Sequence, residues 1–400
     1  MFHFVFLWIR MSTWFRSDTP GRQGFPEAMS VRVLGTGLRK GRSLLSIITI
    51  GEKVMYINIL LRRMTRACAA SLFTAAFLFG ISAPLSAAED CSNRGDLDSR
   101  YCDADGDLVA DTPTDSSKWL NPDTLIFSYT PVEDPSVYEN VFTEFMAYLS
   151  KATGKKTKWY GAESYAAQVE AMRSGRLHVA GISTGPTVFG VNLAGYVPIA
   201  IMGKDDGRFG YKLQLITHKD SDIMKVSDLK GRNVAHVTPS SNSGNQAPRA
   251  LFKSLGVEPD KDYEVKYSGK HDNSIMGVAN KYYDAAPIAS SVLDRMAEKG
   301  IVNKDDLRII WESKLFPTTS YGFAHNLHPD LQRQITYAFL SFDWKGTALD
   351  KEFGSKSDRF ISISFKDHWS DIRTIQNING TVYNQDALKG LKVKKSKKKK

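Results

Sequence analysis

The chain has 400 residues and a formal net charge of +10 at pH 7. This charge is unevenly placed, because residues 1–88 carry 11 Lys and Arg against 3 Asp and Glu, and residues 389–400 add 8 Lys. The remaining body, residues 89–388, has 34 basic and 40 acidic side chains. A mildly acidic body argues against a basic face for nucleic acid, so we expect no nucleic-acid partner.

Near the N-terminus, residues 64–88 have the form of a secretory signal peptide. Basic residues, an apolar run from Ala67 to Ile81 and small residues up to Ala88 follow one another in the expected order. The apolar run is shorter than the roughly 18 residues of a membrane anchor, so we favour cleavage and a periplasmic product. Residues 1–63 are then interpreted as a mis-called or disordered leader.

Residues 89–123 form an acidic leader and linker with two cysteines, Cys91 and Cys102. Two cysteines in an exported chain favour one disulfide, which would close a small loop here. At the other end of the chain, residues 389–400 predict a disordered, solvated lysine tail. A weak attraction of this tail to anionic lipid is the alternative.

Four aspartates follow the second cysteine: Asp103, Asp105, Asp107 and Asp111. Their alternate spacing is similar to that of a calcium-binding loop. However, Gly106 stands before the third aspartate, and the closing bidentate Glu of an EF-hand is absent. We therefore keep structural calcium as a weak candidate beside the favoured interpretation, a solvated, turn-rich leader without a cofactor.

From residue 124 onward, strand and helix signals alternate, which predicts an α/β fold with parallel sheets covered on both faces. The expected strands are Thr124–Tyr129, Thr157–Tyr160, Leu177–Ile182, Tyr196–Met202, Tyr211–Thr217, Asn233–Val237, Tyr263–Tyr267, Asp284–Ile288, Leu307–Trp311 and Ser320–Ala324. The expected helices are Val137–Leu149, Tyr165–Met172, one opening at Gly185, Val226–Leu229, Pro248–Leu255, Ser274–Tyr282, Ser291–Lys299 and His328–Phe342.

The most informative segment is the loop after the strand Asn233–Val237. It contains small hydroxyl and amide residues and leads into a helix, so it could offer N–H and hydroxyl groups to an anion at the positive end of that helix. We place the helix start between Ser243 and Asn245, because Ser243 and Gln246 have capping-box spacing and Pro248 fits only a first turn. An ordinary N-cap is the alternative.

Together these residues resemble the periplasmic substrate-binding proteins of phosphate, phosphite and phosphonate ABC transporters, which have the type II periplasmic-binding fold. The resemblance covers about residues 124–376. Its signatures occur in the family's order: Glu163-Ser164-Tyr165, Gly185-Pro186, Phe209-Gly210-Tyr211, Asp228-Leu229-Lys230-Gly231-Arg232, Pro239-x-Ser241-x-Ser243-Gly244 and Ser268-Gly269-Lys270-His271-Asp272.

The resemblance implies two lobes with a ligand cleft between them. Lobe 1 would comprise residues 124–213 plus 317–388, and lobe 2 residues 214–316. It also implies a phosphorus oxyanion as ligand, and a permease and an ATPase as separate partner chains. The ligand-binding residues carried over by position are Tyr165, Tyr211, Ser241, Asn242, Ser243, Gly244 and His271.

The sequence departs from the family pattern where members that bind aminoalkyl phosphonates carry two acids. Ser290-Ser291 stands where a Glu would be, and Pro317-Thr318-Thr319 where an Asp would be. An ammonium group would be left unpaired in such a cleft, which is costly. We therefore predict methylphosphonate, phosphite or phosphate as the ligand.

Three other functions compete with this interpretation. An enzyme is disfavoured, because no nucleophile-elbow pattern or metal-spaced histidines occur in the sequence. A type II binding protein could instead take another anion or a metal, including ferric ion held by tyrosines such as Tyr165 and Tyr211. A sensor or surface protein could use the same fold without a transporter.

Overall fold

The computed structural model describes Cys91 and residues 93–390. The expected signal peptide, residues 64–88, the leader before it and most of the lysine tail lie outside the described residues. Helix α13 (Gln385–Gly390) includes the first two residues of the expected tail, which are therefore helical. Over the described range, none of the helices has the length and apolar character needed to cross a membrane.

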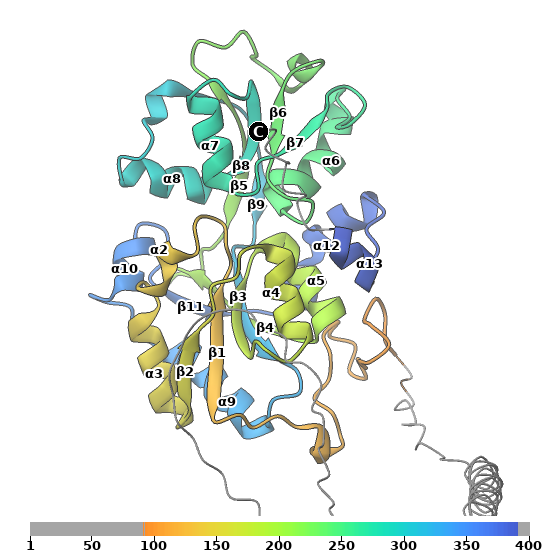
Figure 1. The fold of residues 1–400 in the computed structure, drawn as a ribbon, viewed down its shortest axis with the longest axis vertical. Coiled ribbons are helices and arrows are strands. Elements are labelled where there is room, and N and C mark those ends of the chain that lie inside the picture. Colours follow the sequence, from red (N-terminus) through yellow and green to blue (C-terminus); the bar gives the residue numbers. More distant parts are fainter. Residues whose placement is uncertain (1–90, 92, 391–400) are drawn as a thin grey trace, which may run out of the picture. The chain divides into compact units, whose positions relative to one another are not determined.

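The described chain is built around two β-sheets, which define two lobes (Figure 1). Lobe 1 contains the six-stranded sheet, in the order β11-β4-β10-β3-β1-β2, and lobe 2 the five-stranded sheet, in the order β7-β6-β8-β5-β9. The strands of lobe 1 are β1 (Thr124–Tyr129), β2 (Lys156–Trp159), β3 (Val179–Ile182), β4 (Tyr196–Gly203), β10 (Ser320–Ala324) and β11 (Arg359–Ser362). Those of lobe 2 are β5 (Tyr211–His218), β6 (Val234–His236), β7 (Val265–Tyr267), β8 (Ala285–Ala289) and β9 (Leu307–Phe316).

Most helices belong to lobe 1. They are α2 (Ser136–Glu139), α3 (Thr143–Thr153), α4 (Tyr165–Arg173), α5 (Thr184–Ala194), α9 (Pro329–Ser341), α10 (Ala348–Phe353), α11 (Phe365–His368), α12 (Ser370–Ile378) and α13. Lobe 2 has α6 (Ala247–Leu251), α7 (His271–Ala279) and α8 (Ser290–Glu298). Short turns of other helix types complete the chain: η1 (Ser116–Lys118), η2 (Val226–Leu229), η3 (Asn242–Gln246), η4 (Phe252–Leu255) and η5 (Lys304–Asp306).

Both sheets contain parallel pairs, as expected for parallel-rich sheets flanked by helices, and each also contains antiparallel pairs. β1 runs parallel to β2 and β3, and β6 runs parallel to β7 and β8. β10 is antiparallel to both β3 and β4, and β5 is antiparallel to β8 and β9. The chain runs from β4 of lobe 1 into β5 of lobe 2, and from β9 of lobe 2 into β10 of lobe 1, without an intervening helix. Because parallel neighbours need a helical crossover before the second strand, β5 and β10 pair antiparallel to their neighbours instead.

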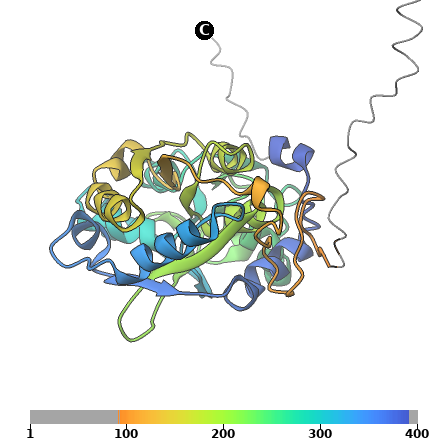
Figure 2. The ribbon, with the colours of Figure 1, turned by 90° about the horizontal axis from the view of Figure 1, so that it is seen from below.

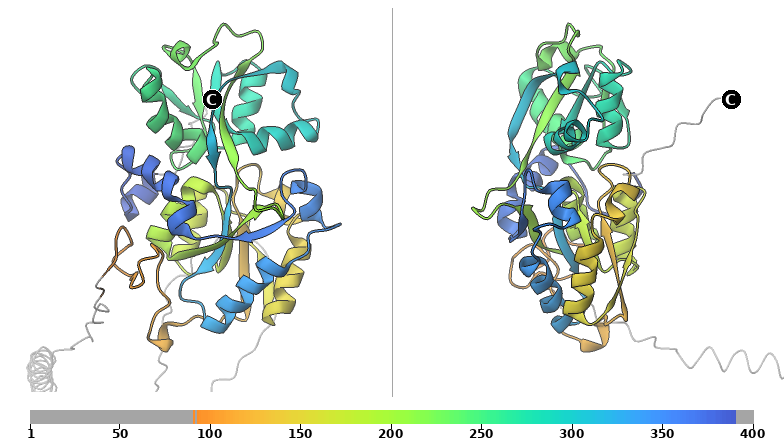
Figure 3. Two further views of the ribbon diagram at one scale, coloured as in Figure 1. Left: turned by 180° about the vertical axis from the view of Figure 1, so that it is seen from behind. Right: turned by 90° about the vertical axis from the view of Figure 1, so that its left-hand side faces the viewer.

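The chain crosses between the lobes after β4 and again after β9, and these two crossings form the connection (Figure 3). The whole of β5 pairs in the sheet of lobe 2, so the boundary expected between residues 213 and 214 falls inside this strand. Gly210, the last residue before β5, has a φ of 114°, and a Cβ there would lie 2.9 Å from the carbonyl oxygen of Phe316. Only glycine fits this place.

Helices cover both faces of the lobe 1 sheet. The crossovers β1-α3-β2 and β2-α4-β3 run in opposite directions along the sheet, and because such crossovers are right-handed, α3 and α4 lie on opposite faces. α9 packs beside α3, and α5 packs beside α4 (Figure 2). α5 is buried along its whole length, so it carries no polar outer face.

Two elements of lobe 1 differ from the sequence expectation. The predicted helix Val137–Leu149 is interrupted between α2 and α3, where Phe142 has a non-helical backbone and its ring is fully buried. Phe142 packs against Phe127 of β1 and Phe145 of α3. We attribute the break in the helix to this packing. The short edge strand β11 was not predicted, because its alternating pattern covers only four residues.

Candidate functional site

A cavity of about 320 Å³ lies between the two lobes. Its inner wall is formed by Tyr129, Ser183 and Thr184 from lobe 1 and by Tyr211, Ser241 and His271 from lobe 2. This volume falls in the range of small-molecule sites. Of the residues carried over from the family resemblance, Tyr211, Ser241 and His271 line the cavity, whereas Tyr165, Asn242, Ser243 and Gly244 lie behind its surface.

Several helices begin at this cavity. The N-terminal residues of α5, α7 and α8, which are Thr184, His271 and Ser290, all line it, and η3 begins directly after Ser241. Each helix N-terminus carries partial positive charge and free N–H groups. Converging helix starts from both lobes therefore favour a negatively charged ligand without a cluster of basic side chains.

The loop after β6 enters its helix differently from the sequence expectation. Ser241, not Ser243, is the N-cap, because its Oγ accepts from the N–H of Gly244 at 3.2 Å. The next turn, η3, is π-helical: the N–H of Gln246 donates to the carbonyl of Ser241 at 2.9 Å. Pro248 does fall in the first turn of α6, as its missing N–H requires.

Two glycines allow close contacts at this loop, Gly185 between the lobes and Gly244 within lobe 2. A Cβ on Gly185, at the start of α5, would lie 2.2 Å from the carbonyl oxygen of Ser240. A Cβ on Gly244 would lie 2.4 Å from the Val237 side chain. Both distances are impossible for real atoms, so larger residues would push the loop away from α5 or from β6.

His271 presents an N–H to the cavity. Its Nδ1 accepts from the backbone N–H of Ala289 at 3.1 Å, so in the neutral ring the proton sits on Nε2. That Nε2 lies 3.4 Å from Ser241 Oγ. Burial lowers the pKa of His271 to about 3, so the ring is neutral at ordinary pH and acts as a hydrogen-bond donor rather than a cation.

A second contact joins the loop to the crossing strand. Asn242 Nδ2 donates to the hydroxyl of Tyr211 at 3.2 Å, and both side chains are buried. The Tyr211 phenol thereby keeps its own proton available for a further acceptor. The loop, β5 and α7 thus bring three predicted residues, Tyr211, Asn242 and His271, around Ser241.

Some buried hydroxyl groups of this region do not line the cavity. Within the described residues, Tyr165 OH and the Oγ atoms of Ser240 and Ser243 are buried and lack a hydrogen-bond partner. Burial raises the pKa of the Tyr165 phenol, so it remains protonated and can donate. Unpaired buried donors cost free energy, so the loop around Ser241 holds hydrogen-bonding capacity that its own contacts do not use.

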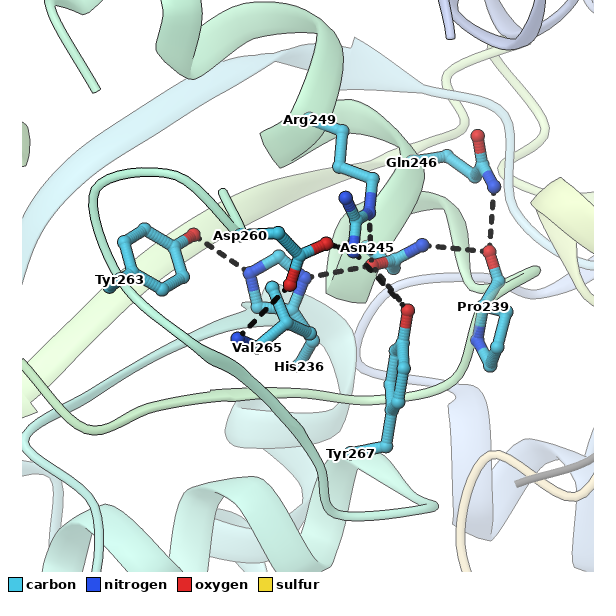
Figure 4. A network of polar contacts seen from close by, with 9 residues as sticks. All are labelled: His236, Pro239, Asn245, Gln246, Arg249, Asp260, Tyr263, Val265 and Tyr267. Atoms are coloured by element: carbon cyan, nitrogen blue, oxygen red, sulfur yellow. Dashed lines mark hydrogen bonds and ion pairs between the residues drawn. The ribbon is translucent and has the colours of Figure 1, made fainter. Parts of the chain in front are cut away.

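A network of polar side chains supports the loop from behind (Figure 4). Asn245 Oδ1 accepts from His236 Nδ1 at 2.8 Å and from Arg249 Nε at 3.0 Å, while Asn245 Nδ2 donates to the carbonyl of Pro239 at 2.8 Å. The Tyr263 hydroxyl lies 2.8 Å from His236 Nε2. His236 is thus a satisfied core histidine, as its position inside a strand predicts, and its network fixes the loop's course.

Another part of the cavity wall carries hydroxyl side chains, at the positions where the family resemblance implied acids. Ser290, Ser291, Thr318 and Thr319 all line it. Two carboxylates, Asp294 and Glu352, also reach the wall, and sequence reasoning missed both. Each is already paired: Asp294 with Lys304 and with Lys356 at 3.1 Å, and Glu352 with Lys299 at 2.7 Å.

A buried ion pair between the lobes also escaped the sequence analysis. Arg295 of α8 donates to Glu133, which follows β1, and Tyr138 donates to the same carboxylate. Burial alone would raise the pKa of Glu133, but the Arg295 charge and hydrogen bond outweigh it and the pKa is lowered. Arg295 lies on the buried face of α8 beside Val292 and Met296. An arginine among the apolar positions of an amphipathic helix was the sequence signal that could have indicated a buried ion pair.

Comparison with known proteins shows which family this chain belongs to. A sequence model of the family described as "ABC transporter, phosphonate, periplasmic substrate-binding protein" matches residues 127–369, more than half of the chain. The chain belongs to this family. The matched region includes both lobes and the whole inner wall of the cavity.

Similar curated proteins are named for phosphate import or phosphonate binding. The phosphate-import protein PhnD of Mycolicibacterium smegmatis is 28% identical over 243 residues, which are 58% of this chain and 75% of that protein. The phosphonates-binding periplasmic protein of Escherichia coli is 25% identical over 222 residues, 54% of this chain and 66% of that protein.

A solved structure shows the same fold. PhnD1 from Prochlorococcus marinus, in complex with methylphosphonate, aligns with a TM-score of 0.58 at 20% sequence identity, covering 66% of this chain and 100% of that one. The α/β fold with two sheets flanked by helices is therefore that of the type II periplasmic-binding proteins, as the sequence predicted.

Proposed function

We propose that this protein captures a small phosphorus oxyanion in the cavity between its lobes and delivers it to an ABC permease driven by a separate ATPase. The observation that carries the proposal is the donor set around Ser241. Neutral His271, Ser241 and Tyr211 line the cavity beside the N-termini of α5, α7 and α8, and this set is suited to an anion that accepts several hydrogen bonds. Membership of the family supports the same role.

Exchange of the ligand requires the lobes to separate and close again. Closure would be favoured because the ligand contacts both lobes only in the closed state. Two crossings, at Gly210 and at residues 317–319, are the places where the backbone could bend. Capture of this kind needs no catalytic step, and the family description supports a periplasmic setting for it.

The proposed ligand is methylphosphonate, phosphite or phosphate. The cavity wall carries hydroxyl groups rather than acids at Ser290, Ser291, Thr318 and Thr319. The two carboxylates on the wall, Asp294 and Glu352, already pair with lysines, so neither is free to pair with a ligand amine. Burial raises the pKa of the Tyr165 phenol, so this side chain does not offer the phenolate that a ferric site needs.

Calorimetric titration with phosphate, phosphite, methylphosphonate, 2-aminoethylphosphonate and sulfate tests the proposal. We expect saturable binding of at least one of the first three, with 2-aminoethylphosphonate and sulfate much weaker. Tight binding of 2-aminoethylphosphonate with no binding of the first three would overturn the ligand assignment. No binding of any phosphorus oxyanion would overturn the function.

A further inference from the structure

The acidic leader holds a cluster of carboxylates that takes no part in lining the cavity. One carboxylate oxygen each from Asp103, Asp105 and Asp107 lies within 4.8 Å of the others. Two ligand atoms on one Ca²⁺ can be about 5 Å apart at most, since each bond is about 2.3–2.6 Å. The three oxygens are therefore close enough to share one ion.

Asp103 supplies an independent sign that a ligand belongs here. Its side chain is only 1% exposed, and its Oδ1 is buried without a hydrogen-bond partner. Its other oxygen, Oδ2, accepts from the N–H of Leu108 at 3.2 Å. A buried carboxylate oxygen without a partner is costly, and a bound cation is one of the few groups that can satisfy it.

The surrounding charges offer no alternative partner. Among the described residues, no Lys, Arg or His forms an ion pair with Asp103, Asp105, Asp107 or Asp111. Lys366 comes near, but its Nζ donates to the carbonyl of Gly106 at 2.9 Å. Several like charges in one small loop repel one another unless a cation is present.

We propose that Asp103, Asp105 and Asp107 bind one Ca²⁺. Hard oxygen ligands from alternate residues of an acidic loop suit this ion, and Asp111 stands four residues beyond the third ligand. The Asp111 side chain accepts from the N–H of Ala104 at 2.6 Å, so it closes the loop rather than pointing away from it. The absence of a closing Glu leaves further coordination to backbone oxygens and water.

Binding would fix the leader on lobe 1. The loop directly follows Cys102, which forms a disulfide with Cys91. On the lobe 1 side, Arg100 donates to the carbonyl of Leu193 at 2.8 Å, and Asp98 pairs with Arg173 at 3.4 Å. Calcium would therefore stiffen a segment that is already anchored at its start, and this role is independent of the oxyanion site.

Calorimetric titration of CaCl₂ into the chelator-treated full chain tests the proposal. We expect one site, with a dissociation constant near the roughly 10⁻⁴–10⁻³ M of extracellular calcium modules. Asp105→Asn should weaken it at least tenfold, because the exposed side chain can keep its hydrogen bond from Asp107 N–H while losing its charge. Asp386→Asn, at an exposed aspartate that pairs with Lys389, is the matched control and should bind as the unchanged chain does.

A thermal unfolding series with CaCl₂, MgCl₂ and neither salt gives a second readout. We expect CaCl₂ to raise the unfolding temperature of the unchanged chain and of Asp386→Asn but not of Asp105→Asn, since only a folded chain with an intact site gains from the ion. No saturable calcium binding up to about 10 mM, ten times the weak end of that range, would overturn the proposal. Equal calcium binding by Asp105→Asn and the control would overturn it too.

Discussion

Arg295 and Glu133 form a buried ion pair across the two lobes. Arg295 Nη2 lies 2.6 Å from Glu133 Oε2, and the two side chains are 9% and 8% exposed. Arg295 also lies 3.7 Å from Glu352 of lobe 1, and its Nη1 donates to the carbonyl of Ser291 at 3.1 Å. The pair therefore stabilises the contact between lobes at one side of the cavity.

Breaking this pair should be costly. In Arg295→Met, the Glu133 carboxylate would stay buried without its charged partner, so we expect a loss of about 3–5 kcal/mol in the free energy of unfolding, with weaker ligand binding. The double variant Glu133→Gln with Arg295→Met should recover much of that loss. Lys219→Met, which breaks an exposed pair with Asp306, should change stability little. Denaturant unfolding measures all of them, and equal stability of single and double variants would contradict the account.

Removing the Ser241 hydroxyl should weaken ligand binding. Ser241→Ala removes a donor to the oxyanion and the N-cap of η3, and a hydrogen bond to a charged group contributes about 1.5–3 kcal/mol. We therefore expect the dissociation constant to rise roughly 10- to 100-fold. Ser254→Ala is the control, because its exposed hydroxyl lies in η4 and donates to the carbonyl of Leu251. Unchanged affinity in Ser241→Ala, measured by calorimetry, would remove this loop from the site.

Acid should destabilise the protein through its buried histidines. Burial lowers the pKa of His271 to about 3 and of His236 to about 4, whereas both have a pKa of about 6.5 in the unfolded chain. Below pH 6.5 the unfolded chain therefore binds protons that the folded chain does not. This contribution to stability is present above about pH 6.5 and is lost as the pH falls towards 4, by about 1.4 kcal/mol per pH unit for each histidine.

Urea unfolding at pH 7.5 and pH 5.0 measures this effect. We expect a lower free energy of unfolding at pH 5.0, and a smaller difference in His236→Gln, which removes one of the histidines whose pKa burial lowers. Equal or greater stability at pH 5.0 would show that these histidines are not held neutral in the folded chain.

A single acid in the cavity should alter ligand choice. Thr318→Asp would place a carboxylate on the cavity wall, within the segment where the family resemblance implies an acid in members that bind aminoalkyl phosphonates. We expect this variant to gain affinity for 2-aminoethylphosphonate and to lose affinity for methylphosphonate, through attraction to the amine and repulsion of the anion. Thr318→Asn is the uncharged control of the same size. A gain of equal size in both variants would show that charge is not the cause.

Much of the fold could be predicted from local pattern. The strands β1 and β10 have the predicted ends, because each is a compact run of buried residues between polar or Pro-containing segments. The mixed direction of the strands could not be predicted in this way. It depends on where the chain crosses between the lobes, and alternation of strand and helix signals does not report that crossing.

The site could be predicted only where its residues form a local sequence pattern. The loop at Ser241 carries its own signal, whereas the Glu133–Arg295 pair joins residues 162 positions apart and has no local signature. The π-helical turn η3 was also missed, because Ser241 and Ser243 are both good caps by residue type. The choice between them depends on the Gly244 carbonyl, which accepts from the N–H of Val237 at 3.0 Å.

A crystal structure of the chain grown with methylphosphonate or phosphate tests the central claim most directly. The account predicts the oxyanion between the lobes, with its oxygens about 2.7–3.2 Å from Ser241 Oγ and His271 Nε2. An oxyanion bound elsewhere, with the Ser241 loop and His271 making no contact to it, would contradict the account.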